Sequence, residues 1–291
     1  MLDLQVRHQQ LREKARTLHT RPLAEQSLGE RLERLRIRTS TRPPATPASL
    51  AASLQGEVVA PGLVELVRTY PLPLRHGDAT VASGRTLGEV VGSLGKPASP
   101  VAPEDLLCLD TETTGLAGGT GTVAFMVGLA WLEGGSLRIV QWLLAGFAGE
   151  GGLLARVRER MALARVLVTF NGKSFDLPLL KARARLAGTE IPTDGLAHLD
   201  LLHVTRRLLQ SGWPDCRLRT AETRALRLER ADDLPGSEAP AAWRRWLERG
   251  DASLLGRVAD HNRADLLALV ALLALLERPT AREAPLLQTR L

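Results

Sequence analysis

The chain has 291 residues, of which 44% are hydrophobic and 24% charged, a composition that excludes a disordered or fibrous protein and is typical of a globular one. Its longest apolar stretch, Leu266 to Leu276, is shorter than the roughly 18 to 20 residues that cross a bilayer. A formal charge of +6 and a pI near 10.1 favour polyanionic partners, because basic surfaces attract phosphate backbones. The charged N-terminus has no uninterrupted apolar core, so we expect a cytoplasmic protein without a secretory signal.

The residue pattern divides the chain into an appendage and a main domain. The N-terminal residues have the basic, amphipathic periodicity of a helical arm, and the proline-rich stretch STRPPATPAS after them is typical of an extended linker. Val-rich pieces separated by Gly and Pro then predict a small β-rich region. The predicted ranges are the arm at 1–39, the linker at 40–50, the β-rich region at 51–103, the main domain at 104–279 and a tail at 280–291.

Apolar runs of strand length and helical periods alternate in the main domain. The runs LLCLD, VAFMVGLAW and SLRIVQWLL predict three adjacent strands, and VLVTF predicts a fourth strand after an intervening helix. The pattern indicates an α/β fold with a mixed central sheet. The predicted helices cover 151–164, a stretch ending at 186, and the ranges 196–209, 216–228 and 254–277.

The first of these strands ends in an acid, Asp110, and Glu112 follows two residues later. Side chains two residues apart in a strand point to the same side, so these acids form a candidate paired site. The alternative is structural: Asp110 caps the strand and the threonines around Glu112 form a polar turn. This motif alone does not distinguish the paired acid site from the structural alternative.

A third acid, Asp176, follows the strand VLVTF and a Gly-containing turn, at the start of a predicted helix with Pro178 in its first turn. An aspartate at this place commonly caps the helix N-terminus, which is again a structural alternative. Its weight as a site residue depends on its partners.

The last predicted helix carries His261 and Asp265 within its apolar stripe, so we expect both side chains to face inward. A buried ionised carboxylate needs a partner or a cation. A buried His261–Asp265 pair is the alternative, since residues four apart are helical neighbours. A shared Mg²⁺ or Mn²⁺ would account for the acids of all three segments at once, because these cations prefer oxygen ligands. Zinc fits less well, since the chain lacks a Cys/His cluster with zinc spacing.

Together these residues resemble the DEDD exonuclease superfamily, whose three motifs occur here in the family's order as Asp110-Thr111-Glu112, Asn171 to Asp176 (NGKSFD) and His261 to Asp265 (HNRAD). The wider context, including HLDLLHVTRRLL and HNRADLLALV, is similar to the YprB-type ribonuclease H-like family of bacterial proteins. The resemblance implies a ribonuclease H-like mixed five-stranded sheet flanked by helices, with a small N-terminal helical and β appendage. It also implies a nuclease, expected to be a 3′-to-5′ exonuclease.

The resemblance also implies roles for individual residues. His261 is the candidate residue for activating or orienting water. It lies four residues before Asp265, as the tyrosine of one DEDD subgroup does, whereas the catalytic histidine of the other subgroup lies five residues before. The ligands of two Mg²⁺ or Mn²⁺ ions are expected to be Asp110, Glu112, Asp176 and Asp265.

DNA or RNA is the expected partner, held at single-stranded ends through its phosphates and with weak sequence preference. Lys173 is the leading candidate because it lies inside the second motif, and Gly115 and Leu116 would let a terminal nucleotide approach closely. The structural alternative for each is a solvated charge or an ordinary hairpin turn. The candidate nucleic-acid contacts are Thr113, Gly115, Leu116, Asn171, Lys173, Phe175, Arg206 and Arg207, with Arg217 and Arg219 as further cations.

Two other functions stay open from the sequence. The protein could be a non-catalytic nucleic-acid-binding scaffold on a nuclease fold, although the complete set of acids argues against this. Alternatively, the arm at 1–39 could recruit a protein partner that carries the function.

Overall fold

The structure is a computed structural model that describes residues 45–82, 101–115, 121–209, 212–231 and 233–277. The chain divides into two compact units, and all the described residues belong to the second, Ala45–Leu291. The predicted arm, Leu116 and the predicted tail lie outside the described residues. Within the described part of the chain, every helix is too short or too polar to cross a membrane.

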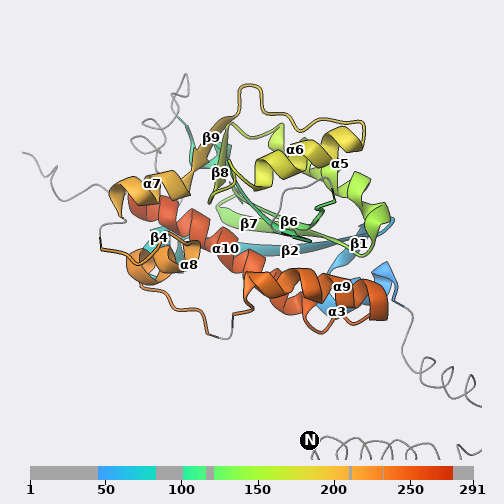
Figure 1. Cartoon of the computed structure of the whole chain (residues 1–291). Helices are drawn as coiled ribbons and strands as arrows, with labels where there is room; N and C mark the ends of the chain where they lie inside the picture. Colours follow the sequence, from blue (N-terminus) through green and yellow to red (C-terminus); the bar gives the residue numbers. More distant parts are fainter. Residues whose placement is uncertain (1–44, 83–100, 116–120, 210–211, 232, 278–291) are drawn as a thin grey trace, which may run out of the picture. The chain divides into compact units, whose positions relative to one another are not determined.

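A mixed sheet of seven strands, in the order β1-β2-β7-β6-β5-β8-β9, forms the centre of the described residues (Figure 1). Strand β5 pairs antiparallel with β6 and parallel with β8, and β8 pairs parallel with β9. The predicted mixed sheet flanked by helices is therefore confirmed. The strands of this sheet are β1 (Glu57–Ala60), β2 (Leu63–Pro71), β5 (Leu106–Thr113), β6 (Ala124–Glu133), β7 (Ser136–Leu144), β8 (Val166–Thr169) and β9 (Ala197–Asp200).

The sheet has more strands than the five that were expected, because part of the β-rich region joins it. Strand β2 pairs antiparallel with β7 along its whole length, from Leu63↔Leu144 to Pro71↔Ser136, and β1 pairs with β2. A separate hairpin, β3 (Leu74–His76) and β4 (Ala79–Val81), follows in the same region. The predicted division between 51–103 and 104–279 stays a prediction.

Helices pack on both faces of the sheet (Figure 1). In β5, Leu107 and Leu109 belong to the cluster that contains Leu153 of α5, whereas Leu106 and Cys108 belong to the cluster that contains residues of α10 such as Leu269. Asp110 and Glu112 continue the second set in the alternation of the strand, so they belong to the face under α10. The helices are α3 (Pro47–Leu54), α5 (Glu150–Met161), α6 (Asp176–Leu186), α7 (Leu201–Leu208), α8 (Leu218–Ala221), α9 (Ala239–Arg249) and α10 (Leu255–Leu276), with the short turns η1 (Pro103–Asp105), η2 (Phe147–Gly149) and η4 (Gly236–Glu238) and the π-helix η3 (Glu222–Leu226).

Two stretches predicted as continuous helices are divided in the structure. Within 196–209, β9 occupies Ala197–Asp200 and α7 begins at Leu201. The strand forms because its backbone pairs with β8, and it gives way to a helix because the Asp200 side chain accepts a hydrogen bond from the backbone N–H of Leu202 and caps α7. Within 216–228, α8 passes directly into the π-helix η3.

Helix α3 begins inside the range predicted as an extended linker. Thr46 and Ser49 form a reciprocal capping box, and Pro47 stands at the start of the helix, where its missing N–H costs nothing. Residues 47–50 are therefore helical and not extended. Helix α9 (Ala239–Arg249) lies in a stretch for which no element was predicted.

Candidate functional site

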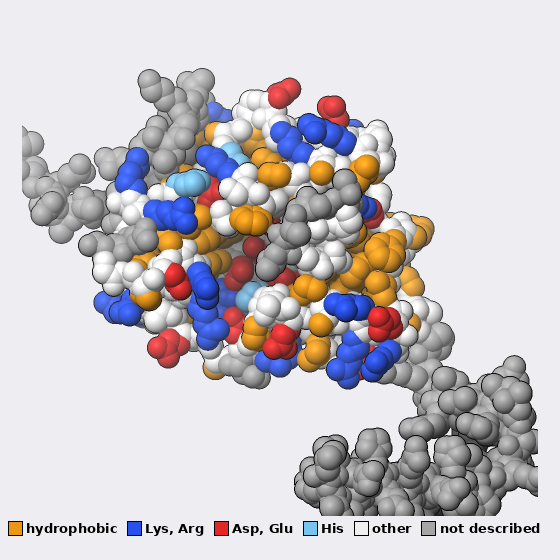
Figure 2. Space-filling view, viewed as in Figure 1, with side chains coloured by type: hydrophobic (Ala, Val, Ile, Leu, Met, Phe, Trp, Pro, Cys, Tyr) orange, Lys and Arg blue, Asp and Glu red, His pale blue; other side chains and the backbone are white. Residues whose placement is uncertain are grey.

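The carboxylates predicted as metal ligands lie close to one another although they come from three separate elements. The charges of Asp265, Asp176 and Glu112 all act on Asp110, and those of Asp265 and Asp176 act on Glu112. Figure 2 shows acidic side chains gathered in the hollowed middle of one face, with Lys and Arg side chains around them. The four carboxylates are Asp110 and Glu112 from β5, Asp176 from the first turn of α6, and Asp265 from α10.

Hydrogen bonds connect the three motifs. The hydroxyl of Thr111 donates to Asp176 Oδ1 at 2.5 Å, joining β5 to α6. Asn262 Nδ2 donates to Asp110 Oδ2 at 2.7 Å, joining α10 to β5. The relative positions of the carboxylates are therefore held by side-chain contacts as well as by the backbone.

The Asn262 side chain bridges two strands of the sheet, β7 and β5, across the strand β6 that lies between them. Gln141 of β7, Gly128 of β6 and Asp110 of β5 are successive partners across the sheet. The Asn262 side chain accepts from Gln141 Nε2 at 2.8 Å and donates to Asp110, so it crosses above Gly128. A side chain at Gly128 would meet the Asn262 oxygen and Leu266. Glycine at this strand position therefore leaves the space that the Asn262 bridge needs.

The apolar stripe predicted on α10 is buried at Val258, Leu269 and Leu272. Asn262 is fully buried, together with Val258 and Leu266, which lie one turn before and after it. The side chains of His261 and Asp265 keep 18% and 17% of their surface exposed. Both side chains are therefore mostly buried, as the expected inward orientation requires, and they lie beside the carboxylates of the site.

His261 is held by a carboxylate that the sequence did not reveal. Its Nδ1 lies 2.7 Å from Asp233 Oδ1, whereas its Nε2 lies 3.8 Å from Asp265 Oδ2. A hydrogen bond from Nδ1–H to Asp233 orients the ring, and in the neutral form of that ring Nε2 is the acceptor nitrogen. His261 is thus paired mainly with Asp233 and not with Asp265, the partner in the structural alternative.

A buried aspartate shapes the turn of the second motif. Asp200 is 2% exposed and accepts hydrogen bonds from the backbone N–H groups of Asn171 at 2.7 Å and Lys173 at 3.0 Å. Asn171 has a φ of 66°, a left-handed conformation that Asn tolerates better than most residues. Asp200 therefore holds the turn that leads into Asp176.

Burial and mutual repulsion disfavour ionisation of the carboxylates at this site. Burial, followed by the charges of Asp265, Asp176 and Asp233, raises the pKa of Glu112 to about 8. Burial also raises the pKa of Asp176 to about 6, against the opposing effect of the hydrogen bond from Thr111. The pKa of Asp110 is raised well above its usual value by burial and then by neighbouring carboxylates. Ionising these carboxyls together therefore costs free energy, and a bound cation would offset that cost.

The raised pKa of Glu112 predicts a stability loss at rising pH in the absence of metal. Below the unfolded pKa of 4.5 the Glu112 carboxyl is protonated in both the folded and the unfolded chain, and the stability of the fold is at its full value. As the pH rises from there toward about 8, only the unfolded chain loses this proton, so the free energy of unfolding falls by up to about 1.4 kcal/mol per pH unit. A Glu112→Gln variant stays neutral, so its free energy of unfolding should rise relative to wild type between about pH 5 and about pH 8. Urea unfolding in a chelating buffer measures this, and a difference that does not change with pH would contradict it.

The described residues contain no set of three or more His, Cys, Asp or Glu side chains arranged as a ready-made metal site. Three of the carboxylates have other partners: Asp110 with Asn262, Asp176 with Thr111, and Asp265 with Arg230. The donor chemistry nevertheless fits Mg²⁺ or Mn²⁺, because four neighbouring carboxylates supply the hard oxygen atoms that these cations bind. Each of these contacts engages one oxygen of the carboxylate, so the other oxygen would be the one to bind a cation.

The candidate nucleic-acid contacts lie on several separate segments. Lys173 and Phe175 are exposed in the turn before Asp176, with 53% of Phe175 accessible. The hydroxyl of Thr113 donates to the carbonyl of Gly115, and no described atom lies within 4 Å of where a Cβ on Gly115 would be. The remaining candidate cations are exposed on other segments, Arg206 and Arg207 on α7 and Arg217 and Arg219 at the start of α8. Their role stays a prediction.

Several polar residues of the site were not predicted from the sequence. Asn262 had a signal, because it interrupts the helical spacing of Val258 and Leu266 with a polar residue. The others come from irregular segments, from strands or, for Glu222, from the π-helix η3, where periodicity says nothing about a distant partner. The missed residues are Gln141, Asp200, Glu222, Arg230, Asp233 and Asn262.

Residues 107–277 match the family RNase_H_2, described as the RNase_H superfamily. The chain belongs to this superfamily. It is also 33% identical over 211 residues to the protein YprB of Bacillus subtilis (strain 168), a match that covers 70% of this chain and 50% of YprB. The chain thus spans about half the length of that relative, and the predicted resemblance to the YprB-type family is confirmed.

Two solved structures are similar over part of their length. The family B DNA polymerase from Pyrobaculum calidifontis has a TM-score of 0.49 and 14% identity, covering 74% of this chain and 29% of the polymerase. E. coli Exonuclease I in complex with a dT13 oligonucleotide has a TM-score of 0.41 and 15% identity, covering 61% of this chain and 42% of the exonuclease.

Proposed function

We propose that this member of the RNase_H superfamily is a divalent-metal-dependent nuclease of the DEDD exonuclease type, which hydrolyses phosphodiester bonds of nucleic acid from the 3′ end. The proposal depends on one observation: the four carboxylates converge, so that the charges of the other three act on Asp110 and, together with burial, raise its pKa. Such a cluster is costly to a fold unless protons or cations offset its charge. The same cluster is what two Mg²⁺ or Mn²⁺ ions require as ligands.

When bound by the four carboxylates, these ions would lower the pKa of the attacking water and offset the negative charge of the scissile phosphate. His261 would orient that water or accept its proton at Nε2, because Asp233 occupies Nδ1. Asn262 would hold Asp110 in place through its 2.7 Å hydrogen bond. The carboxylates would thus bind the ions, His261 would act on the water or its proton, and Asn262 would position Asp110.

The turn before Asp176 would hold the substrate strand. Phe175 is a large hydrophobic side chain exposed beside the acidic cluster, and an exposed aromatic ring in that place can stack on a nucleobase without sequence preference. Lys173 is exposed two residues earlier and would contact a backbone phosphate. Asp200 fixes the backbone of both Asn171 and Lys173, so the turn presents them in a defined geometry.

A digestion assay on end-labelled single- and double-stranded DNA and RNA tests the proposal. We expect products that shorten from the 3′ end with Mg²⁺ or Mn²⁺ and no products with a chelator, because the four carboxylates would act only through the bound ions. Absence of cleavage on all these substrates with either metal would contradict the proposed activity. Shortening from the 5′ end would contradict only the direction.

A further inference from the structure

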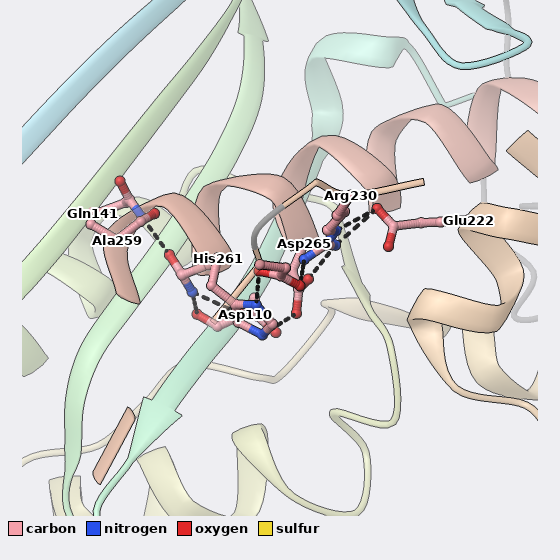
Figure 3. Close-up of polar contacts among 9 residues, drawn as sticks. Asp110, Gln141, Glu222, Arg230, Ala259, His261 and Asp265 are labelled. Carbon is pink, nitrogen blue, oxygen red and sulfur yellow. Dashed lines mark hydrogen bonds and ion pairs between the residues drawn. The ribbon is translucent and has the colours of Figure 1, made fainter. Parts of the chain in front are cut away.

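A guanidinium group lies buried among carboxylates at the edge of the candidate site. The Arg230 side chain is 9% exposed and contacts three acids (Figure 3). Its Nη2 lies 2.5 Å from Asp265 Oδ1 and 2.8 Å from Glu222 Oε1, and its Nη1 lies 3.4 Å from Asp233 Oδ2. One of these acids is a proposed metal ligand, and another is the partner of His261.

The fold builds a dedicated support for this arginine. Glu222, the first residue of the π-helix η3, is fully buried, and its Oε1 accepts from both Nε and Nη2 of Arg230. The π-helix ends at Arg227 with a left-handed φ of 54°, and the Leu226 carbonyl accepts from the backbone N–H of Asp78. The segment that carries Arg230 is thus anchored at its start. π-helical turns are rare and often occur at functional sites.

The contacts of Arg230 determine how two site residues are oriented. Because Nη2 holds Asp265 Oδ1, the other oxygen, Oδ2, is the one that faces His261 Nε2, at 3.8 Å. Through Nη1, Arg230 also reaches Asp233, whose Oδ1 lies 2.7 Å from His261 Nδ1. A single planar guanidinium thereby links the acid and the histidine in one rigid network.

We propose that Arg230 is a positioning residue of the nuclease site, which orients Asp265 for metal binding and His261, through Asp233, for its role at the water. The proposal rests on the proposed function. A guanidinium that merely competed with metal ions for Asp265 would have the opposite effect, because its removal would then strengthen metal binding. Hydrogen-bonded partners of metal ligands typically contribute about 10- to 100-fold to metal affinity.

Binding of Mn²⁺ alone to the full chain, measured by titration calorimetry or by the electron paramagnetic resonance of free Mn²⁺, tests this positioning role. We expect Arg230→Gln to weaken Mn²⁺ binding by about 10- to 100-fold. Arg230→Lys should weaken it less, because a lysine keeps the charge but cannot hold Asp265 and Asp233 together. Arg224→Gln is the matched control, since Arg224 is an exposed arginine of the preceding π-helix η3.

Each outcome has a separate meaning. Unchanged or tighter Mn²⁺ binding by folded Arg230→Gln overturns the positioning role, whereas absence of Mn²⁺ binding by the wild type overturns the proposed function itself. If thermal unfolding shows that Arg230→Gln does not fold, Arg230→Lys decides, and affinity equal to wild type in that variant contradicts the proposal.

Discussion

An Asp110→Asn variant is expected to lose at least about a hundredfold in metal-dependent cleavage while it remains folded. Asp110 is the carboxylate on which the charges of the other three converge, so its replacement removes a ligand at the centre of the proposed site. The asparagine keeps an oxygen that can accept the hydrogen bond from Asn262, and it removes a charge that burial disfavours. Initial rates on an end-labelled substrate with saturating Mg²⁺ or Mn²⁺ measure the loss.

The control for this variant is Asp194→Asn, which removes one negative charge from an exposed loop that precedes β9. It should cleave at the wild-type rate. Equal rates in wild type and Asp110→Asn would remove the enzyme hypothesis and leave the non-catalytic nucleic-acid scaffold. Binding of labelled nucleic acid to both variants separates these functions, because a scaffold would keep its affinity without cleavage.

Local sequence patterns were sufficient to place the acids on the right elements. Asp110 and Glu112 were predicted on one strand face, Asp176 at the start of a helix, and Asp265 within the last helix, and the structure has them there. These predictions depend only on strand alternation, turn residues and helical spacing, which act over a few residues. That the acids meet in one place was inferred from the single cation that would account for all three segments and from the family resemblance, since no local pattern specifies a distance between segments.

Features that depend on distant parts of the chain were not predictable in this way. Strand β9 is only four residues long and forms because β8 offers it a parallel partner, so its own residues looked helical. Arg230 and Asp233 lie in irregular chain between η3 and α9, where spacing carries no information about their partners. Their importance comes from ion pairs to Asp265 and His261 that only the folded chain brings together.

At Gly128 the sequence indicated a constraint but not the distant group that causes it. A glycine inside the apolar run VAFMVGLAW indicates a weak point of a strand or a close approach of another group, without saying which. The structure supplies the group: the Asn262 side chain crosses above this position from Gln141 to Asp110. The glycine is therefore tied to the site by sterics, although it has no side chain to take part in chemistry.

A Gly128→Ala variant is expected to lose roughly 1–3 kcal/mol of unfolding free energy, the usual cost of overpacking a core, and to weaken metal-dependent cleavage together with it. The added Cβ would lie 2.7 Å from Leu266 Cδ1 and closer still to the Asn262 oxygen. Both atoms belong to side chains of α10, so these side chains must turn or the helix must move away from β6, and the Asn262 bridge is disturbed in either case. Urea unfolding and initial cleavage rates measure the two effects.

Gly151→Ala is the matched control for this substitution, because a Cβ at Gly151 in α5 would meet no atom of the described residues within 4 Å and alanine favours a helix over glycine by about 1 kcal/mol. This control should unfold at the wild-type free energy or above it. Truncating the bridging side chain in Asn262→Ala removes the nearer of the two clashes, so the double variant should lose less than the sum of the single variants. Strict additivity would mean that Gly128 and Asn262 do not press on each other, and the steric link between this glycine and Asp110 would then be wrong.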